Sequence, residues 1–318
     1  MVQGYFLDLG SRGLPIGAAE MDGLCAPHES KPFIFFHCAH GMGHGLMALH
    51  QNHLPTALEW CDKVSRDFVR ESCYGGAFME NAIQVTHPHH TAAGHAEVQG
   101  GAHGEHDPPA GEHAAHGGHA AAGDAHAGHG AAAMQHGEWR ALDPDDMLYP
   151  CNAVDVKYQA SCYGFQPSPI MFYNRGDVAA TGRVCERVPA AFVLICFNSL
   201  GREITAWADQ EHPRTIEGCE RLGDAGGGQG RVWCLQGAVE TLINQTANTE
   251  DGMRFCRAVP GTDAKEGCYR SVGTFMMTLL DAADVDGRAR QCAAAEPGFV
   301  AACRRGAELP ALAGQSGS

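Results

Sequence analysis

Short apolar stretches that suit a helix recur along the chain, and each of them follows a cysteine. They read AHGMGHGLM, YGGAFMENAI, YGFQPSPIM, FNSLGREIT, LQGAVETLI and YRSVGTFMM after Cys38, Cys73, Cys162, Cys196, Cys234 and Cys268, respectively. A small residue stands three positions after most of these cysteines, at Gly41, Gly76, Ser199, Gly237 and Ser271. Small residues let a neighbouring helix approach closely, so each stretch predicts a helix that packs tightly against another.

A second kind of helix is predicted to end at the other cysteines. The sequences are LPTALEWC, TGRVCERV, TIEGCERL, GMRFCRAV and RARQC. Helix-breaking residues follow at a nearly constant distance, at Pro189, Gly223, Pro260 and Pro297. Because proline and glycine interrupt a helix, we expect each of these helices to end close to its cysteine.

The 14 cysteines fall into seven neighbouring pairs: Cys25 and Cys38, Cys61 and Cys73, Cys151 and Cys162, Cys185 and Cys196, Cys219 and Cys234, Cys256 and Cys268, and Cys292 and Cys303. The spacing within and between pairs gives a repeating unit of about 35 residues, which is typical of a helix hairpin. We therefore expect an all-α fold, an α/α-hairpin solenoid cross-linked by disulfides. The spacing also permits disulfides within a hairpin, for example between Cys38 and Cys61, but we favour the seven short pairs.

This architecture resembles the Sel-one-like repeats, and in particular their cysteine-rich secreted branch. The residues that carry the resemblance are Gly41-Met-Gly43 and Leu54-Pro-Thr-Ala-Leu-Glu-Trp-Cys61, which correspond to a Gly-x-Gly turn and the second helix of a unit. Most other units lack the Gly-x-Gly and the usual alanine and tyrosine anchors. The resemblance implies a helical scaffold that binds other proteins.

The cysteine content changes the picture further, because so many widely spaced cysteines are typical of an oxidising compartment. No C-x-x-C spacing occurs, which is the usual spacing of cysteine-based zinc sites and haem attachment sites. We therefore expect a periplasmic or secreted protein, although residues 1–24 do not read as a signal peptide. The formal charge of −15 argues against nucleic acid as a partner, and no apolar run is long enough for a membrane span.

One interval between cysteines is much longer than the others. Residues 87–138 are rich in histidine, alanine and glycine, and they contain twelve of the 19 histidines. We expect a disordered insertion, after which a helix resumes near Trp139 and ends at Cys151. Neutral imidazole suits copper, zinc and nickel, so this segment is a candidate metal buffer. Its candidate ligands are His87, His89, His90, His103, His106, His113, His116, His119, His126 and His129.

A second candidate metal site lies at the start of the repeat. His40 and His44 are four residues apart and would share one face of a helix. Glu80 occupies nearly the same position in the next unit, so stacking of the two units would bring it close to His44. These three side chains could hold a metal ion or activate water. Alternatively, the histidines cap or pack the helix, and Glu80 pairs with Arg202 or with a backbone donor.

The organisation that we expect is therefore an N-terminal segment 1–24, repeat units over 25–86 that carry the HCAHGMGHG and FMEN motifs, the insertion 87–138, further repeat units over 139–308 and a flexible tail 309–318. The favoured function is a non-enzymatic, extracytoplasmic binding protein that binds or buffers a transition metal ion, copper or zinc in the first place. Its concave face would bind an unknown protein or peptide. The alternatives are a metal-dependent enzyme with a His40/His44/Glu80 site, and a protein–protein interaction scaffold in which the histidine tract is incidental.

Overall fold

The computed structural model describes residues 4–6, 8, 17–86, 139–280 and 283–310. In these residues the fold is all-helical, and the only pairing of the β type is an isolated bridge between Asp143 and Asp146. The expectation of an all-α protein is confirmed for this part of the chain. The histidine-rich stretch 87–138, with all of its candidate ligands, and residues 311–318 of the expected tail lie outside the described residues.

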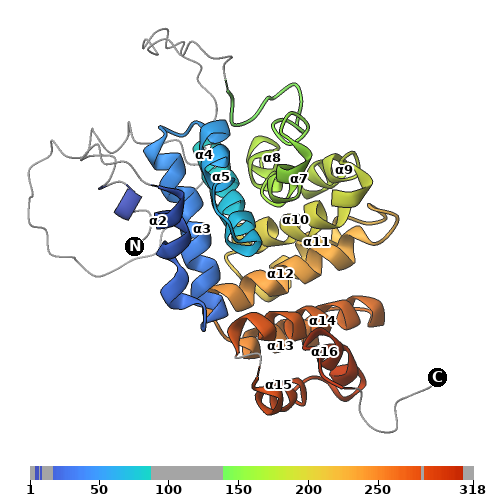
Figure 1. The fold of residues 1–318 in the computed structure, drawn as a ribbon. Coiled ribbons are helices and arrows are strands. Elements are labelled where there is room, and N and C mark those ends of the chain that lie inside the picture. The colour runs from blue at the N-terminus through green and yellow to red at the C-terminus, as the bar shows by residue number, and fades with distance from the viewer. Residues whose placement is uncertain (1–3, 7, 9–16, 87–138, 281–282, 311–318) are drawn as a thin grey trace, which may run out of the picture.

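Long helices alternate with short ones along the chain (Figure 1). The long helices are α3 (Pro32–Leu49), α5 (Asp67–Thr86), α10 (Val193–Trp207), α12 (Gly230–Thr246) and α14 (Thr262–Leu279). The short helices that precede or separate them are α2 (Ala18–Leu24), α4 (Leu54–Cys61), α9 (Val178–Cys185), α11 (His212–Glu220), α13 (Thr249–Ala258) and α15 (Val285–Cys292). The chain also contains α7 (Val156–Tyr163), α8 (Pro167–Tyr173), α16 (Val300–Gly306) and the 3-10 turns η1 (Ala26–His28), η3 (Ala190–Phe192) and η4 (Pro297–Phe299).

The short helices end where the sequence predicted. Helix α9 ends at Cys185 and α15 at Cys292, each a few residues before a proline. Helix α13 ends at Ala258, two residues before Pro260, and α11 ends at Glu220, close to Gly223. Gly223 has a positive φ of 54°, which glycine adopts without strain, so the chain can turn back at this point.

All 14 cysteines form disulfides, and the seven bonds are the short pairs that the spacing favoured. Six of them join a cysteine at or near the end of a short helix to a cysteine in the first two turns of the next helix. Each disulfide closes a loop of about a dozen residues and should stabilise the folded state by roughly 3 kcal/mol, by the chain-entropy estimate. The disulfides therefore fix where each long helix begins relative to the short helix before it.

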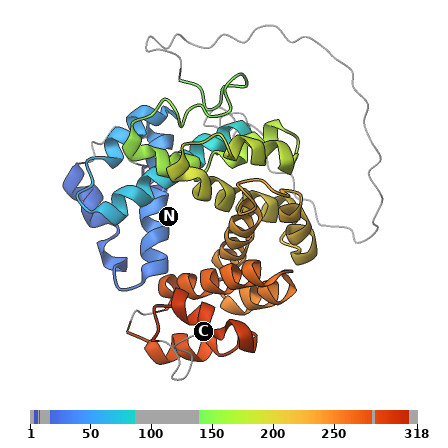
Figure 2. The ribbon, with the colours of Figure 1, turned by 90° about the vertical axis from the view of Figure 1, so that its right-hand side faces the viewer.

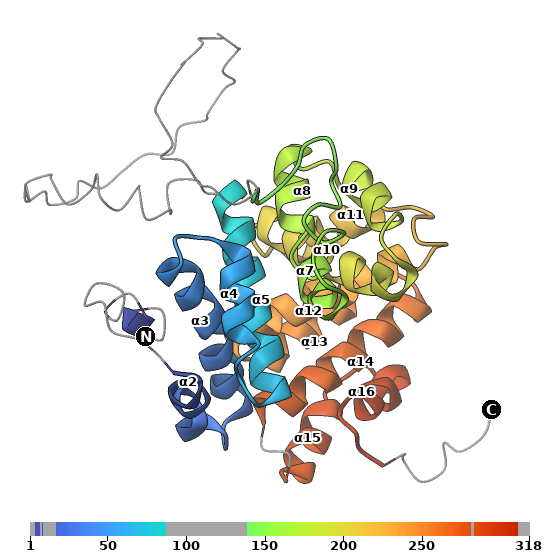
Figure 3. The ribbon, with the colours of Figure 1, turned by 45° about the horizontal axis from the view of Figure 1, so that its top comes forward.

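Most of the long helices pack side by side in pairs, and the chain curls so that α14 returns to α3. Helix α3 contacts α5, α10 contacts α12, α12 contacts α14, and α14 contacts both α16 and α3. Figure 2 shows the curl with α3 (blue) next to the orange helices, and Figure 3 shows the same order from above. The contact between α14 and α3 closes the curl, so the long helices of the first and later units face one another.

Three helix pairs, α3 with α5, α10 with α12 and α14 with α16, touch through glycine at reciprocal positions. The first glycine of each pair stands five residues after its cysteine, and the second stands three residues after its own: Gly43 with Gly76, Gly201 with Gly237, and Gly273 with Gly306. A Cβ atom on any of the six would overlap a backbone carbonyl oxygen of the opposite helix. Backbone therefore lies directly against backbone, which accounts for the small residues that the sequence places three positions after the cysteines.

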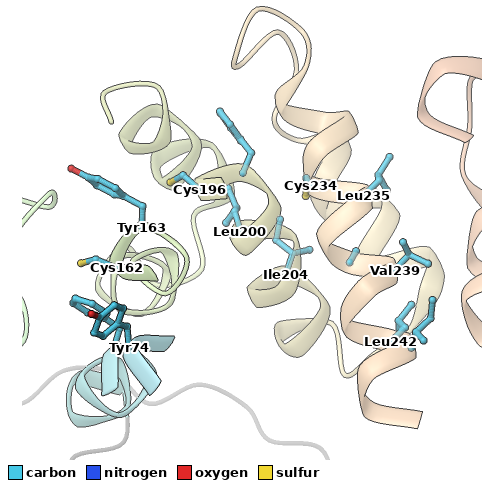
Figure 4. Close-up of a cluster of buried hydrophobic side chains, with 14 of the residues drawn as sticks. Tyr74, Cys162, Tyr163, Cys196, Leu200, Ile204, Cys234, Leu235, Val239 and Leu242 are labelled. Atoms are coloured by element: carbon cyan, nitrogen blue, oxygen red, sulfur yellow. The ribbon is translucent and has the colours of Figure 1, made fainter. Parts of the chain in front are cut away.

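The core lies between the long and the short helices. Phe197, Leu200, Leu235 and Val239 are completely buried, and Figure 4 shows several of these side chains in a row from α10 to α12. Of the aromatic residues, Tyr74, Tyr163 and Phe197 are buried. Trp60 is only half-buried. Its ring stacks against that of His50, and the Lys63 ammonium group lies 3.3 Å from the ring centroid of Trp60.

The helix expected from Trp139 to Cys151 does not form. Residues 139–151 consist of turns and bends, and Gln166 holds them by donating to the carbonyl oxygens of Met147 and Tyr149. Pro144 and Pro150 lie inside this stretch, and proline both lacks a backbone donor and restricts the residue before it. Cys151 nevertheless reaches Cys162 without a helix.

None of the helices in the described ranges is both long and apolar enough to cross a bilayer.

The glycine contacts yield a direct test. Replacing Gly237 with alanine should lower the free energy of unfolding by about 1–3 kcal/mol, because the added methyl group would overlap the Asn198 carbonyl oxygen and push the two helices apart. The matched control is Gly23→Ala, since a Cβ atom there meets nothing within 4 Å. Urea unfolding of the oxidised protein measures the free energy of unfolding of both variants. Equal stability of the two variants would contradict the close contact.

Candidate functional site

Helices α3 and α5 bring four chemically active side chains together on the inner side of the curl. His40 and His44 lie on α3, and Met79 and Glu80 lie on α5. The close approach of the two backbones at Gly43 and Gly76 makes these contacts possible. His44 Nδ1 lies 2.7 Å from Glu80 Oε2, and both side chains are mostly shielded from solvent. The predicted meeting of His44 and Glu80 is therefore confirmed.

His40 faces a residue that the sequence analysis did not single out. Its Nε2 lies 3.4 Å from the thioether sulfur of Met79. The ring also donates to the backbone carbonyl of Ser72, and its Nδ1 lies on the side of Gly75, one turn further along α5. Nε2, which faces Met79, can bind a metal ion in the tautomer that carries the ring proton on Nδ1.

The surroundings keep the His40 ring uncharged. Burial lowers the pKa of His40 to about 3, and repulsion from His44, His37 and Arg202 acts in the same direction. The ring stacks on Phe36, with centroids 5.6 Å apart, and lies 6.0 Å from the ring of Phe165. His40 is therefore neutral at physiological pH, which is the form that binds metal ions.

The separation of His40 and Met79 suits two ligands of a single ion. Metal–ligand bonds of about 2.0–2.3 Å at a tetrahedral angle place nitrogen and sulfur donors roughly 3.6 Å apart. The observed 3.4 Å is close to this value. The His44–Glu80 contact is short enough for a hydrogen bond instead, so Glu80 acts here as the carboxylate that orients a histidine ring.

The predicted three-residue set is not assembled as such. In the part of the chain that the structure describes, no group of three or more histidine, cysteine, aspartate or glutamate side chains is placed to hold a metal ion. His44 and Glu80 meet, but the partner of His40 is the sulfur of Met79. One signal in the sequence could have revealed it, since Met79 follows Cys73 by the same six positions that separate His44 from Cys38.

The alternative partner considered for Glu80, Arg202, is engaged elsewhere. Its guanidinium lies 4.5 Å from the centroid of Phe165 and donates to the Gly164 carbonyl oxygen and to the hydroxyl of Ser199. It also pairs with Glu203 at 3.2 Å. Phe165 thus lies between Arg202 and His40, and the positive charge stays near the cluster without contacting it.

Comparison of the chain with protein-family models, with curated proteins and with solved structures finds no match. The function is therefore argued from the side chains on α3 and α5 and from their surroundings.

The neutral state of His40 can be tested by titration. In histidine ¹⁵N spectra of the full chain, the His40 ring should stay uncharged and in a single tautomer from pH 8 down to about pH 4, because its pKa lies near 3. His40→Gln identifies the signal. Protonation of that signal near the ordinary value of 6.5 would show that the ring is not held as described.

Proposed function

We propose that the protein is an extracytoplasmic helical-repeat protein that binds copper at a site formed by His40, His44 and Met79. In this proposal the units of about 35 residues form a solenoid, and its inner face carries the site. The contact that carries the proposal is the 3.4 Å separation between the neutral imidazole of His40 and the thioether of Met79.

The ligand chemistry favours copper over zinc. A thioether is a soft ligand that suits Cu(I), whereas zinc sites use cysteine, histidine and carboxylates. Every cysteine is in a disulfide, so thiolate ligands are not available to a metal ion. His44 would bind through Nε2 while Glu80 holds its Nδ1, which is the usual way in which a carboxylate fixes a metal-bound histidine.

The histidine-rich stretch 87–138 is the second part of the proposal. Its twelve imidazoles would bind several ions loosely and keep them close to the α3–α5 site, since the stretch begins directly after α5. The seven disulfides support a periplasmic or secreted location, where such bonds persist. The scaffold function implied by the Sel-one-like resemblance stays the alternative.

Copper titration separates the two parts of the proposal. We expect a chain with residues 87–138 replaced by a short linker to bind one Cu(I) ion, as measured by competition with a chromogenic chelator. In this shortened chain, Met79→Leu should weaken Cu(I) binding tenfold or more, a loss of about 1.4 kcal/mol, because it removes one soft ligand. Glu80→Gln should weaken it by roughly 10–100-fold through loss of the carboxylate that orients His44.

The matched control is His212→Gln, because His212 also faces a carboxylate, that of Asp251 at 3.2 Å, but lies in another unit. The affinity of the shortened chain with His212→Gln for Cu(I) should equal that of the shortened chain without this substitution. A shortened chain that binds no copper would remove the α3–α5 site from the proposal. Absence of copper binding in the full chain as well would leave only the scaffold.

A further inference from the structure

A pocket of about 320 Å³ opens on the inner side of the curl, beside the proposed copper site. Helices α10 and α12 form its floor with Asn198, Glu240 and Asn244. Phe36 from α3 and Phe275 from α14 also line it, so the pocket depends on the contact between these two helices. Pockets of this size hold small organic ligands.

The floor of this pocket occupies the same repeat positions as the copper site. Asn198 and His40 both stand two residues after their cysteines, and Glu240 and Met79 both stand six residues after theirs. The contacts correspond too, because Asn198 Nδ2 donates to Glu240 Oε2 at 3.2 Å, as His40 faces Met79. Each contact crosses a helix pair that meets at two glycines. The same backbone geometry thus presents soft ligands at one place and hard oxygen atoms at the other.

Glu240 has neutral partners only. Asn198 and Ser271 form hydrogen bonds with its carboxyl group, and burial raises its pKa. The other charged side chain that lines the pocket is Arg202, but this guanidinium pairs with Glu203 and donates to the Gly164 carbonyl oxygen. The side chains that α3 and α14 contribute, Phe36, Phe275 and Thr278, do not titrate. A cation that enters the pocket would therefore meet a carboxyl group that lacks a charged partner.

We propose that this pocket binds a primary alkylammonium ion, with the Glu240 carboxylate as its counter-ion, the side-chain oxygens of Asn198 and Asn244 as further acceptors, and Phe36 and Phe275 against its alkyl chain. Aromatic faces attract an ammonium group and also bury methylene groups. The net charge of −15 favours the approach of cations over anions. A metal ion is a poorer match, because the pocket supplies one carboxylate where hard cations need several charged oxygens.

Calorimetry of the full chain with three compounds tests the ligand class. n-Butylammonium and N-acetyl-lysine amide should bind, and 1-butanol, which has the same shape without the charge, should not. Tighter binding of the lysine compound assigns the ammonium group to a protein side chain, and tighter binding of butylammonium assigns it to a free amine. Equal binding of butanol would overturn the proposal.

The substitution Glu240→Gln tests whether the Glu240 carboxylate is the counter-ion. It should weaken butylammonium binding tenfold or more. Glu250→Gln is the matched control, because it removes the same charge from an exposed position on α13 and should leave the affinity unchanged. Equal affinities of the two variants would overturn the proposal. Burial raises the pKa of Glu240 above its ordinary value, so in the unchanged protein the affinity should rise with pH and binding should release protons, because the carboxyl group must ionise to hold the cation. An affinity independent of pH would contradict the role of Glu240.

The two sites are independent in this experiment. Glu240→Gln should leave Cu(I) binding of the shortened chain intact, and His44→Ala should leave butylammonium binding of the full chain intact. Failure of one proposal is thus distinguishable from failure of the other.

Discussion

The disulfide between the end of a short helix and the first two turns of the next long helix is the constraint on which the rest of the structure depends. Five of the seven bonds join a short helix to a long one in this way, and a sixth joins α15 to the short helix α16. Each bond aligns two successive helices at their cysteines. Because the cysteines act as common reference points, residues at equal distances from them can make corresponding contacts, as His40 with Met79 and Asn198 with Glu240 do. A helix hairpin of about 35 residues buries too little apolar surface to keep this register alone.

The glycine pairs bring the aligned helices close enough for polar side chains to meet. Backbone contact at Gly43 and Gly76 draws α3 and α5 close enough for the side chains of His40 and Met79 to meet, and contact at Gly201 and Gly237 does the same for Asn198 and Glu240. The helix pair α12 and α14 has Val239 and Ser271 at these positions instead. There the Ser271 hydroxyl reaches the Glu240 carboxyl group across the interface.

The sequence predicted what the cysteine spacing controls. The seven disulfides, the ends of the short helices and the meeting of His44 with Glu80 all follow from counting residues from the cysteines. Met79 was missed because methionine in a helix reads as a core residue, and only the neighbouring helix shows that its sulfur faces His40. The stretch from Trp139 to Cys151 was assigned to a helix because its position in the repeat outweighed Pro144 and Pro150, which prevent a helix there.

The contact between α3 and α14, which closes the curl, could not be predicted from the sequence either. Neither the spacing nor the motifs indicate that α3 contacts α14, because residues so far apart in the chain meet only through the packing of all the helices between them. Closure brings Phe36 from the first long helix into the pocket above Glu240. Two neighbouring environments result, one with the nitrogen and sulfur atoms of His40 and Met79 and one with the oxygen atoms of Asn198 and Glu240. The disulfides between successive helices hold both in place.

The most direct measurement is a disulfide map of the protein purified from its native host, obtained by protease digestion without reduction and mass spectrometry. The account predicts seven linkages, each between neighbouring cysteines such as Cys61 and Cys73 or Cys219 and Cys234, and no free thiol. Linkages within hairpins, such as Cys38 to Cys61, or a majority of free thiols would contradict it, because the common register of the long helices would then be lost.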